Sequence, residues 1–243
     1  MFIIKLNATN STNSYLKALS ATNLLEDYTT VVTNLQTHGR GQMGASWESV
    51  SGMNLTFSTL KVFKAPFLGS HFCLSMVASL AVYKTLVALE IPKLSVKWPN
   101  DILSENKKIC GILIENVIKK NNLNQSVIGI GLNVNQINFN NLPKASSLKL
   151  ITGRTFNLDE VLSSVIENLK FYFSLLQTLG AEALKNNYEA CLFRKNKPST
   201  FRDAEGLFFT GYIKSVSLEG KLQVLLEDHI VKAYNLKEIT LMY

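Results

Sequence analysis

Alternating apolar and polar residues, or runs of β-branched residues, predict three β-strands near the start of the chain. These strands cover residues 2–6, 29–36 and 54–63. Residues 10–21 follow helical spacing instead, and Ser11 or the asparagine before it can cap the amino end of that helix. We therefore expect a strand, a helix and two further strands, in this order.

The middle of the chain combines one long apolar run with strand-like segments. The run 72–83 is shorter than the about 20 residues that cross a bilayer, so we expect a buried helix from Pro66 to about Leu89. Residues 94–103 predict a strand that runs into a Pro-Asn turn. Residues 108–135 predict two strands joined by the polar turn KKNNLNQ, and hence a hairpin.

The spacing of apolar residues becomes helical from Leu158 onward, and a second helix is expected over residues 181–193. Residues 194–200 are charged, polar and interrupted by Pro198, which makes them the best candidate for a domain boundary. Four short strand-like runs follow and predict a small β-barrel-like domain. Because the strands come in antiparallel-looking pairs, the predicted class is α+β.

Composition and charge limit the function classes. The 243 residues, 47% of them hydrophobic, suffice for one substantial core and a small second domain. The amino terminus lacks a secretory signal and the three cysteines are far apart, so we expect a cytoplasmic protein with reduced thiols and no structural metal. The net charge of +7 favours an acidic ligand, but the lysines are too dispersed to predict nucleic-acid binding.

The stretch QTHGRGQMGASWES, residues 36–49, contains the pattern G-x-G-x-x-G at Gly39, Gly41 and Gly44. A dinucleotide fingerprint needs a helix directly after its glycines, and strand alternation follows here instead. A phosphate-binding loop needs a lysine where this chain has Ala45, and the other protein-kinase motifs are missing. Two interpretations remain: a loop that folds closely over a ligand, or a glycine-rich hairpin turn.

Charged and amide side chains in and after this loop suit ligand binding. Arg40 can act as a fixed cation and Trp47 as a cover, unless the first lies in solvent and the second in the core. In the stretch KWPND, Lys97 suits a phosphate or carboxylate, Asn100 can read an adenine edge, and Asp101 can bind magnesium or orient an amine. The alternative for KWPND is a strand end capped by an Asx-type turn.

Three further stretches allow both a structural and a functional interpretation. One member of the pair Lys107 and Lys108 is expected at a solvated strand end. Gly111 either admits a ligand to the backbone or marks a bulge, and Asn133 either offers an amide or belongs to a tightly packed strand. The residues STN at 11–13 form either a helix cap or a set of polar groups for a small ligand.

The stretches STNSYL, QTHGRGQMGASW, VKWPNDI, KICGILIE and IGIGLNVN follow the order and spacing of the biotin protein ligases, or biotin–[acetyl-CoA-carboxylase] ligases, which this sequence resembles. The resemblance implies a catalytic domain over residues 1–195 and a small SH3-like C-terminal domain over residues 199–243. The implied fold is α+β, a mixed, largely antiparallel sheet flanked by helices, similar to class II aminoacyl-tRNA synthetases. The short form, without an N-terminal DNA-binding domain, is expected.

Such enzymes join biotin and ATP into biotinyl-5′-adenylate and transfer biotin to one lysine of a biotin carboxyl carrier protein domain. The resemblance thus implies ATP and Mg²⁺ as cofactors, biotin as substrate, and the carrier domain of a biotin-dependent carboxylase as partner. No DNA or membrane partner is implied, and a homodimer is left open. The rival interpretations are a lipoate or octanoate protein ligase and a non-catalytic biotin-binding regulator.

The same resemblance assigns roles to individual residues. The residues implied to surround biotin are Ser11, Thr12, Asn13, Gln36, Gly39, Arg40, Lys108 and Gly111. The residues implied to hold the nucleotide are Gln42, Trp47, Asn100, Lys108 and Asn133. The implied catalytic residues are Lys108, Arg40 and Asp101. Asp101 is expected to orient the acceptor lysine or help remove its proton, and no metal ligand is expected from the protein side chains.

The glycine loop departs from the family pattern at two positions. Gln42 and Ala45 stand where many members carry arginines, so the loop has two fewer cations. Either Lys97, Lys107 or another cation compensates, or the adenylate is held more loosely. We expect the intermediate to escape faster than from an arginine-bearing enzyme.

Overall fold

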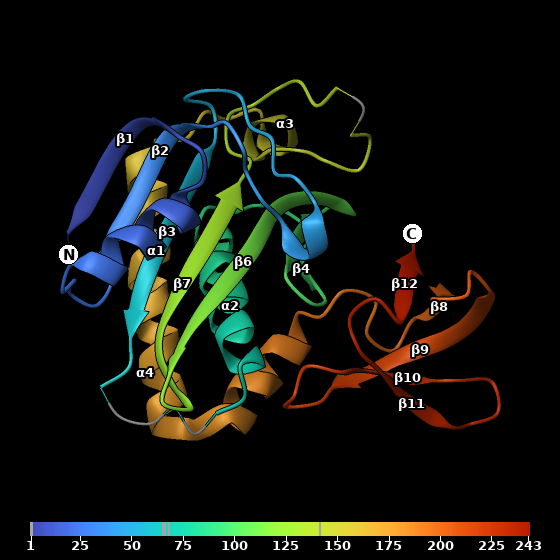
Figure 1. Cartoon of the computed structure of the whole chain (residues 1–243). Coiled ribbons are helices and arrows are strands. Elements are labelled where there is room, and N and C mark those ends of the chain that lie inside the picture. Colours follow the sequence, from blue (N-terminus) through green and yellow to red (C-terminus); the bar gives the residue numbers. More distant parts are fainter. Residues whose placement is uncertain (1, 65–66, 68, 141) are drawn as a thin grey trace.

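The computed structural model describes residues 2–64, 67, 69–140 and 142–243 (Figure 1). The strands of its larger sheet are β1 (Ile3–Thr9), β2 (Thr30–Gln36), β3 (Leu55–Val62), β4 (Leu94–Lys97), β5 (Asp101–Ser104), β6 (Lys107–Lys119) and β7 (Asn122–Leu132). The helices are α1 (Thr12–Thr22), α2 (Phe72–Ala88), α3 (Leu148–Thr152) and α4 (Leu158–Ala190), with a short 3₁₀ turn η1 at Gln42–Gly44. The C-terminal strands are β8 (Pro198–Asp203), β9 (Phe208–Val216), β10 (Leu222–Leu225), β11 (Val231–Tyr234) and β12 (Ile239–Met242).

The large sheet has seven strands in the order β1-β2-β3-β7-β6-β5-β4. Only β1 and β2, which are joined through α1, pair in parallel, and every other neighbour pairs antiparallel. This arrangement confirms the predicted α+β class with a mixed, largely antiparallel sheet. The C-terminal strands form a separate five-stranded antiparallel sheet in the order β11-β10-β9-β8-β12.

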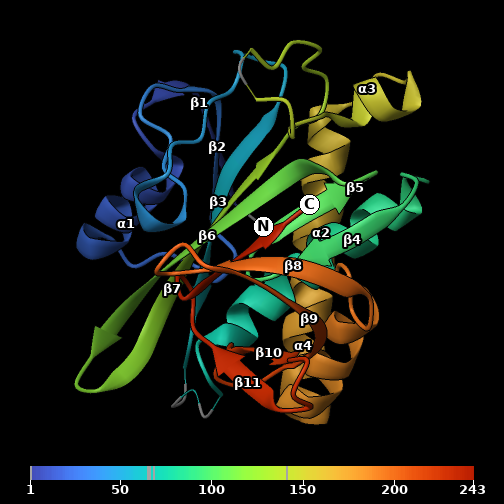
Figure 2. The ribbon, with the colours of Figure 1, turned by 90° about the vertical axis from the view of Figure 1, so that its right-hand side faces the viewer.

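Helices cover both faces of the large sheet, which lies between α1 on one side and α2 with α4 on the other (Figure 2). The main core lies under α2 and α4, where α2 is buried almost all round. A smaller core forms under α1 from Leu16, Val31, Leu60 and Val127. Because both faces of β3 are covered, nearly all of its residues are buried, polar ones included.

Three segments in and around the large sheet refine the sequence prediction. The helix α2 begins at Phe72, and Pro66, its expected start, lies outside the described residues. The predicted Pro-Asn turn is present at residues 98–100, and the chain reverses there, so that a second strand, β5, follows β4. The hairpin turn between β6 and β7 is confined to Lys120 and Asn121, both with positive φ, because strand pairing continues through most of the polar stretch read as a turn.

The C-terminal sheet has five strands, whereas four strand-like runs were expected. The additional strand, β8, starts at Pro198 inside the stretch predicted to be a linker. A proline is tolerated there because it is the first residue of the strand. The long helical stretch is divided at Gly180, whose φ of 80° breaks the helix, so the two predicted helical segments are present.

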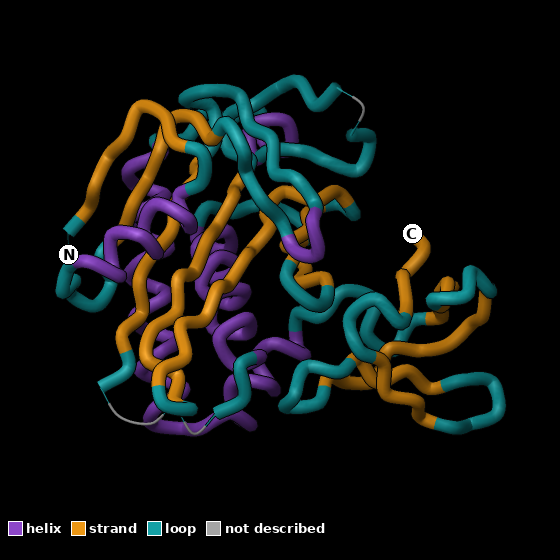
Figure 3. Tube along the Cα trace, viewed as in Figure 1, coloured by secondary structure: helices purple, strands orange, loops and turns teal. Residues whose placement is uncertain are grey.

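Loops gather at one end of the large sheet, where those that follow β2 and β7 lie together (Figure 3). Within the described residues, no helix is long and apolar enough to cross a membrane. The gathered loops and the adjoining strands β3, β6 and β7 enclose the candidate site.

Candidate active site

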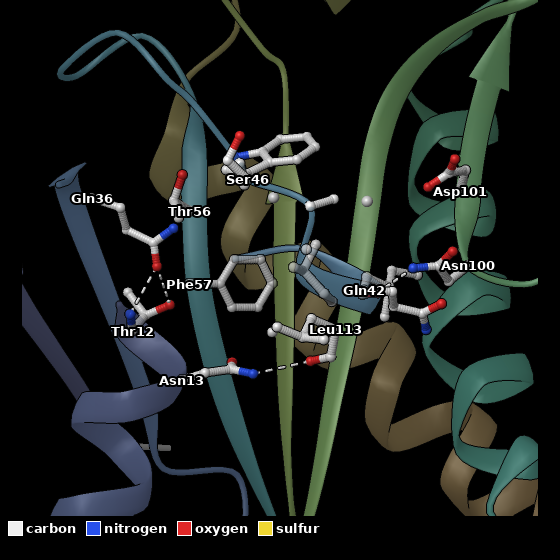
Figure 4. A pocket seen from close by; sticks show the side chains of 18 of the residues that line it. Thr12, Asn13, Gln36, Gln42, Ser46, Thr56, Phe57, Asn100, Asp101 and Leu113 are labelled. Carbon is white, nitrogen blue, oxygen red and sulfur yellow. Dashed lines mark hydrogen bonds between the residues drawn. The ribbon is translucent and has the colours of Figure 1, made fainter. Parts of the chain in front are cut away.

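A cavity of about 230 Å³ opens on the face of the large sheet that carries α1. Its floor is formed by β3, β6 and β7, and the glycine loop covers part of it. Figure 4 shows Thr12, Asn13 and Gln36 on one side of the cavity and Asn100 and Asp101 on the other. These two sides are called the neutral end and the charged end below.

The neutral end is a network of uncharged groups that satisfy one another. Gln36 Oε1 accepts hydrogen bonds from the backbone N–H of Thr12 at 2.8 Å and from its hydroxyl at 3.1 Å. The Ser58 hydroxyl lies 2.7 Å from Thr12 Oγ1 and 2.6 Å from Asn13 Oδ1. Asn13 Nδ2 donates to the Leu113 carbonyl at 3.2 Å. Because each group is buried or half-buried and already bonded, this end keeps a fixed shape.

The start of α1 determines how these residues are presented. Ser11 caps the helix by accepting a hydrogen bond from the backbone of Ser14, as the sequence predicts, so its hydroxyl serves the helix. The next two residues then begin the helix with their side chains toward the sheet. Phe57 and Leu113 add an apolar wall beside Asn13 (Figure 4).

Glycines on β6 and β7 let protein side chains lie directly on the sheet. A Cβ atom at Gly131 would stand 2.3 Å from Trp47 Cε2, and one at Gly129 would stand 2.3 Å from Asn13 Oδ1. Gly111 faces the same Trp47 ring. The glycine in β6 was expected to admit a ligand or to mark a bulge, but it makes room first for Trp47.

The indole of Trp47 lies in the middle of the cavity lining with an unused donor. Its Nε1 is buried and has no hydrogen-bond partner among the described residues. A buried N–H without a partner is costly, so a ligand acceptor placed beside it would be stabilised.

The charged end brings together residues from β4, β5 and β6. Lys108 Nζ lies 2.7 Å from Asp101 Oδ1, and Lys97 Nζ lies 4.0 Å from Asp101 Oδ2. Burial lowers the pKa of Lys97, Asp101 opposes that shift, and the neighbouring Lys108 and Lys144 add to it. More cations than carboxylates therefore face one another at this end.

Asn100 and Gln42 complete the charged side. The Asn100 amide donates to the Ile112 carbonyl at 2.6 Å, which holds its turn against β6. Gln42 begins the 3₁₀ turn of the glycine loop and lies on the same side as Asn100 (Figure 4). A long neutral side chain thus stands where the family pattern has an arginine.

Arg40 does not point into the cavity. Its guanidinium donates to Glu115 Oε2 at 2.9 Å and to Ser14 Oγ at 3.0 Å, and about half of the side chain is exposed. Gly39 lies at the base of the same loop, where a Cβ atom would stand 2.1 Å from the backbone oxygen of Trp47. The base of the glycine loop is therefore closed by contact between backbones. The Arg40 guanidinium is held outside the cavity.

The structure brings most, but not all, of the proposed site residues to the cavity. Those that line it are Thr12, Asn13, Gln36, Gln42, Trp47, Asn100, Asp101, Lys108 and Gly111. Those that do not line it are Ser11, Gly39, Arg40 and Asn133. The Asn133 amide donates to the Ser146 carbonyl at 3.0 Å from a buried position, which ties β7 to the following loop.

Glu115 is the main participant that the sequence interpretation missed. It binds Arg40 and also accepts from Asn13 Nδ2 at 2.9 Å, which links the loop to the neutral end. The available signal was a single acidic residue inside the apolar strand KICGILIE. The second residue that was missed is Lys144, in the loop after β7, which is a neighbouring cation of Lys97. No sequence pattern indicated its position.

The donor set of the cavity suits a ligand with a neutral polar head and an anionic tail. Across the described ranges, no group of three or more His, Cys, Asp or Glu side chains is arranged to hold a metal ion. Asp101 is the carboxylate that lines the cavity, so a divalent cation there would depend on oxygen atoms of the ligand.

Several known protein ligases are similar to this chain. Residues 6–133 match the model of the Biotin/lipoate A/B protein ligase family. The chain is 29% identical over 220 residues to the bifunctional ligase/repressor BirA of Bacillus spizizenii, covering 88% of this chain and 67% of that protein. It is 34% identical over 146 residues to the biotin–[acetyl-CoA-carboxylase] ligase of Mycobacterium tuberculosis, covering 58% of this chain and 52% of that protein.

A solved structure matches nearly the whole chain. The biotin protein ligase from Aquifex aeolicus in complex with biotin and ATP has a TM-score of 0.81 and 28% sequence identity, covering 99% of this chain and 98% of that chain.

Proposed function

Because the chain belongs to the Biotin/lipoate A/B protein ligase family, we infer that it is a biotin–[acetyl-CoA-carboxylase] ligase. It uses ATP to convert biotin into biotinyl-5′-AMP and then transfers biotin to a lysine of a carboxylase carrier domain. The observation that carries this inference is the single cavity that joins a neutral hydrogen-bonding end to a lysine-rich end.

The neutral end binds the ureido ring of biotin. That ring offers two N–H donors and one carbonyl acceptor, which match the amide and hydroxyl groups of Thr12, Asn13 and Gln36. Phe57 and Leu113 line the path for the thiophane ring and the aliphatic chain. The carboxylate of biotin then points toward Lys108.

The charged end holds the nucleotide and the reacting groups. Trp47 and Asn100 are suited to the nucleoside, the former through its unused indole N–H. Lys108 lies between the biotin carboxylate and the α-phosphate and offsets the repulsion of two anions that must meet. A carboxylate oxygen of biotin attacks the α-phosphorus, and pyrophosphate leaves.

Mg²⁺ fits this site only as a companion of ATP. It requires oxygen ligands, and Asp101 is the carboxylate in the lining. When bound, the ion supplies charge neutralisation for the phosphates. The protein residues then have the tasks of orienting the two substrates and excluding water.

In the second step the amine of the acceptor lysine attacks the carbonyl carbon of the adenylate, and AMP leaves. That amine must first lose a proton, since only about 0.04% of an ordinary lysine is neutral at pH 7. Asp101 lies beside Lys108. From there it orients the amine or helps remove the proton of that amine. Arg40 reaches the ligand only after its ion pair with Glu115 breaks. Closure of the glycine loop therefore exchanges Glu115 for the ligand as the partner of Arg40.

Biotin-dependent exchange of pyrophosphate into ATP tests this function. We expect exchange with biotin, and little with lipoate or octanoate offered in parallel. Exchange with lipoate or octanoate alone identifies the rival ligases, and exchange with none of the three leaves a non-catalytic binding protein.

A further inference from the structure

Three lysines from separate parts of the chain converge at the rim of the charged end. Lys97 ends β4, Lys108 lies in β6, and Lys144 lies in the loop after β7. The backbone N–H of Lys108 donates to the Lys144 carbonyl at 2.7 Å, so strand pairing keeps that loop beside the site. This hydrogen bond thus holds the backbones of Lys108 and Lys144 next to each other.

The ring of Tyr243 lies close to two of these lysines. The distances from its centroid are 4.9 Å to Lys97 Nζ and 4.4 Å to Lys144 Nζ, both within cation–π range. Lys144 Nζ also donates to the backbone oxygen of Tyr243 at 2.5 Å. Phe193 packs edge-on against the same ring at 5.2 Å. The residue that follows β12 therefore connects the C-terminal sheet to the charged end.

The side chains of this cluster have more positive than negative charge. Asp101 is the carboxylate beside Lys97 and Lys108, and its nearer oxygen already contacts Lys108. The Tyr243 hydroxyl adds no compensating charge, since burial and Asp101 raise its pKa. Three lysines that face Asp101 and the Tyr243 carboxyl oxygen still carry excess positive charge, and an anion with several charges relieves their mutual repulsion.

Building on the ligase function inferred above, we propose that Lys144 binds the terminal phosphates of ATP, and the pyrophosphate that leaves, with Tyr243 as its positioning residue. Lys108 is assigned to the α-phosphate, so the later phosphates extend from it toward the rim. Lys144 is exposed at that rim and can meet them, and Lys97 lies near the same Tyr243 ring. This cation compensates in part for Gln42 and Ala45.

Steady-state kinetics of a matched pair of variants test the proposal. Lys144→Met removes the charge but keeps the aliphatic stem, and Lys119→Met makes the same change at an exposed lysine at the far end of β6. We expect Lys144→Met to raise the KM for ATP and the inhibition constant of inorganic tripolyphosphate about tenfold, as for one lost charge-assisted contact. The KM for biotin should change less than twofold, and Lys119→Met should leave all values near wild type.

Tyr243 provides a second, independent comparison. Tyr243→Phe keeps the ring and the backbone oxygen and should retain the wild-type KM for ATP, whereas Tyr243→Leu should raise it several-fold with kcat little changed. Lys144→Arg should recover most of the affinity lost in Lys144→Met. If Tyr243 and Lys144 had only a structural role, their variants would instead lower kcat without a selective rise in the KM for ATP.

The outcomes separate this proposal from the ligase function. No biotin-dependent exchange by the wild-type chain overturns the ligase function itself. Normal exchange with an unchanged KM for ATP in Lys144→Met overturns the phosphate role of Lys144. A raised KM for the carrier domain alone also overturns it and assigns Lys144 to protein docking.

Discussion

The two ends of the cavity differ in how their polar groups are satisfied. At the neutral end, Thr12 and Asn13 are 3% exposed and bond to other protein groups. At the charged end, Lys108 keeps 37% of its side chain exposed, and the nearby Trp47 N–H has no partner among the described residues. One end is therefore complete without a ligand, whereas the other depends on one.

This contrast follows the chemistry of the two substrates. The ureido ring of biotin carries no charge, so shape and fixed hydrogen bonds suffice to select it. ATP and the biotin carboxylate carry negative charge, whereas in the ligand-free protein Lys97 and Lys108 share the single carboxylate of Asp101. Substitutions at the charged end should therefore affect the reaction rates or the KM for ATP, and substitutions at the neutral end should affect biotin affinity.

The largest effect is expected for Lys108→Met. Loss of a preorganised cation at the reacting atoms should reduce adenylate formation about 10²–10³-fold. Biotin-dependent pyrophosphate exchange measures this step, and Lys119→Met serves as the control. A loss smaller than fivefold would remove Lys108 from the reaction centre.

Asp101→Asn should separate the two chemical steps. We expect single-turnover transfer from preformed biotinyl-5′-AMP to the carrier lysine to fall about 10²-fold, within the range for loss of a general base. Adenylate formation should fall much less, because Lys108 keeps its charge. Equal losses in both steps would refute the assigned role.

Thr12→Val tests the neutral end at nearly constant volume. The variant removes the hydroxyl that bonds Gln36 and Ser58 and leaves the backbone N–H in place. The KM for biotin should rise about five- to tenfold, the effect of one missing hydrogen bond in a buried network. The KM for ATP should stay at its wild-type value, and a parallel rise in both would show that the two ends are not independent.

Gln42→Arg should have the smallest effect of the four. It restores one of the two cations missing from the loop, and we expect retention of biotinyl-5′-AMP to lengthen a few-fold because the added charge meets a phosphate. Release of the intermediate can be followed by rapid filtration after ATP is removed. An unchanged release rate would mean that other lysines already supply the missing cations.

The sequence predicted which residues lie in paired strands. It did not predict the direction in which side chains outside regular pairing point. The motif containing Lys108 reaches the cavity because β6 must pair with β7 to bury its apolar face. The direction of Arg40 is decided instead by Glu115, 75 residues away, and no local pattern contains that contact. Asn133 is similarly turned aside by the Ser146 carbonyl.

The C-terminal sheet illustrates the same limit. Its strand β8 begins inside a polar, proline-containing stretch, because pairing with β9 and β12 stabilises it more than local composition opposes it. Long-range pairing of this kind also brings Tyr243 to the site.

The central claim is that this protein attaches biotin to a single lysine of a carrier domain. The most direct test is the intact mass of an apo biotin carboxyl carrier domain after incubation with the protein, biotin and MgATP. We predict a gain of one biotinyl group on one lysine, which requires both biotin and ATP. No gain in mass, or a gain of a lipoyl or octanoyl group in place of biotin when those acids are also offered, would contradict the account.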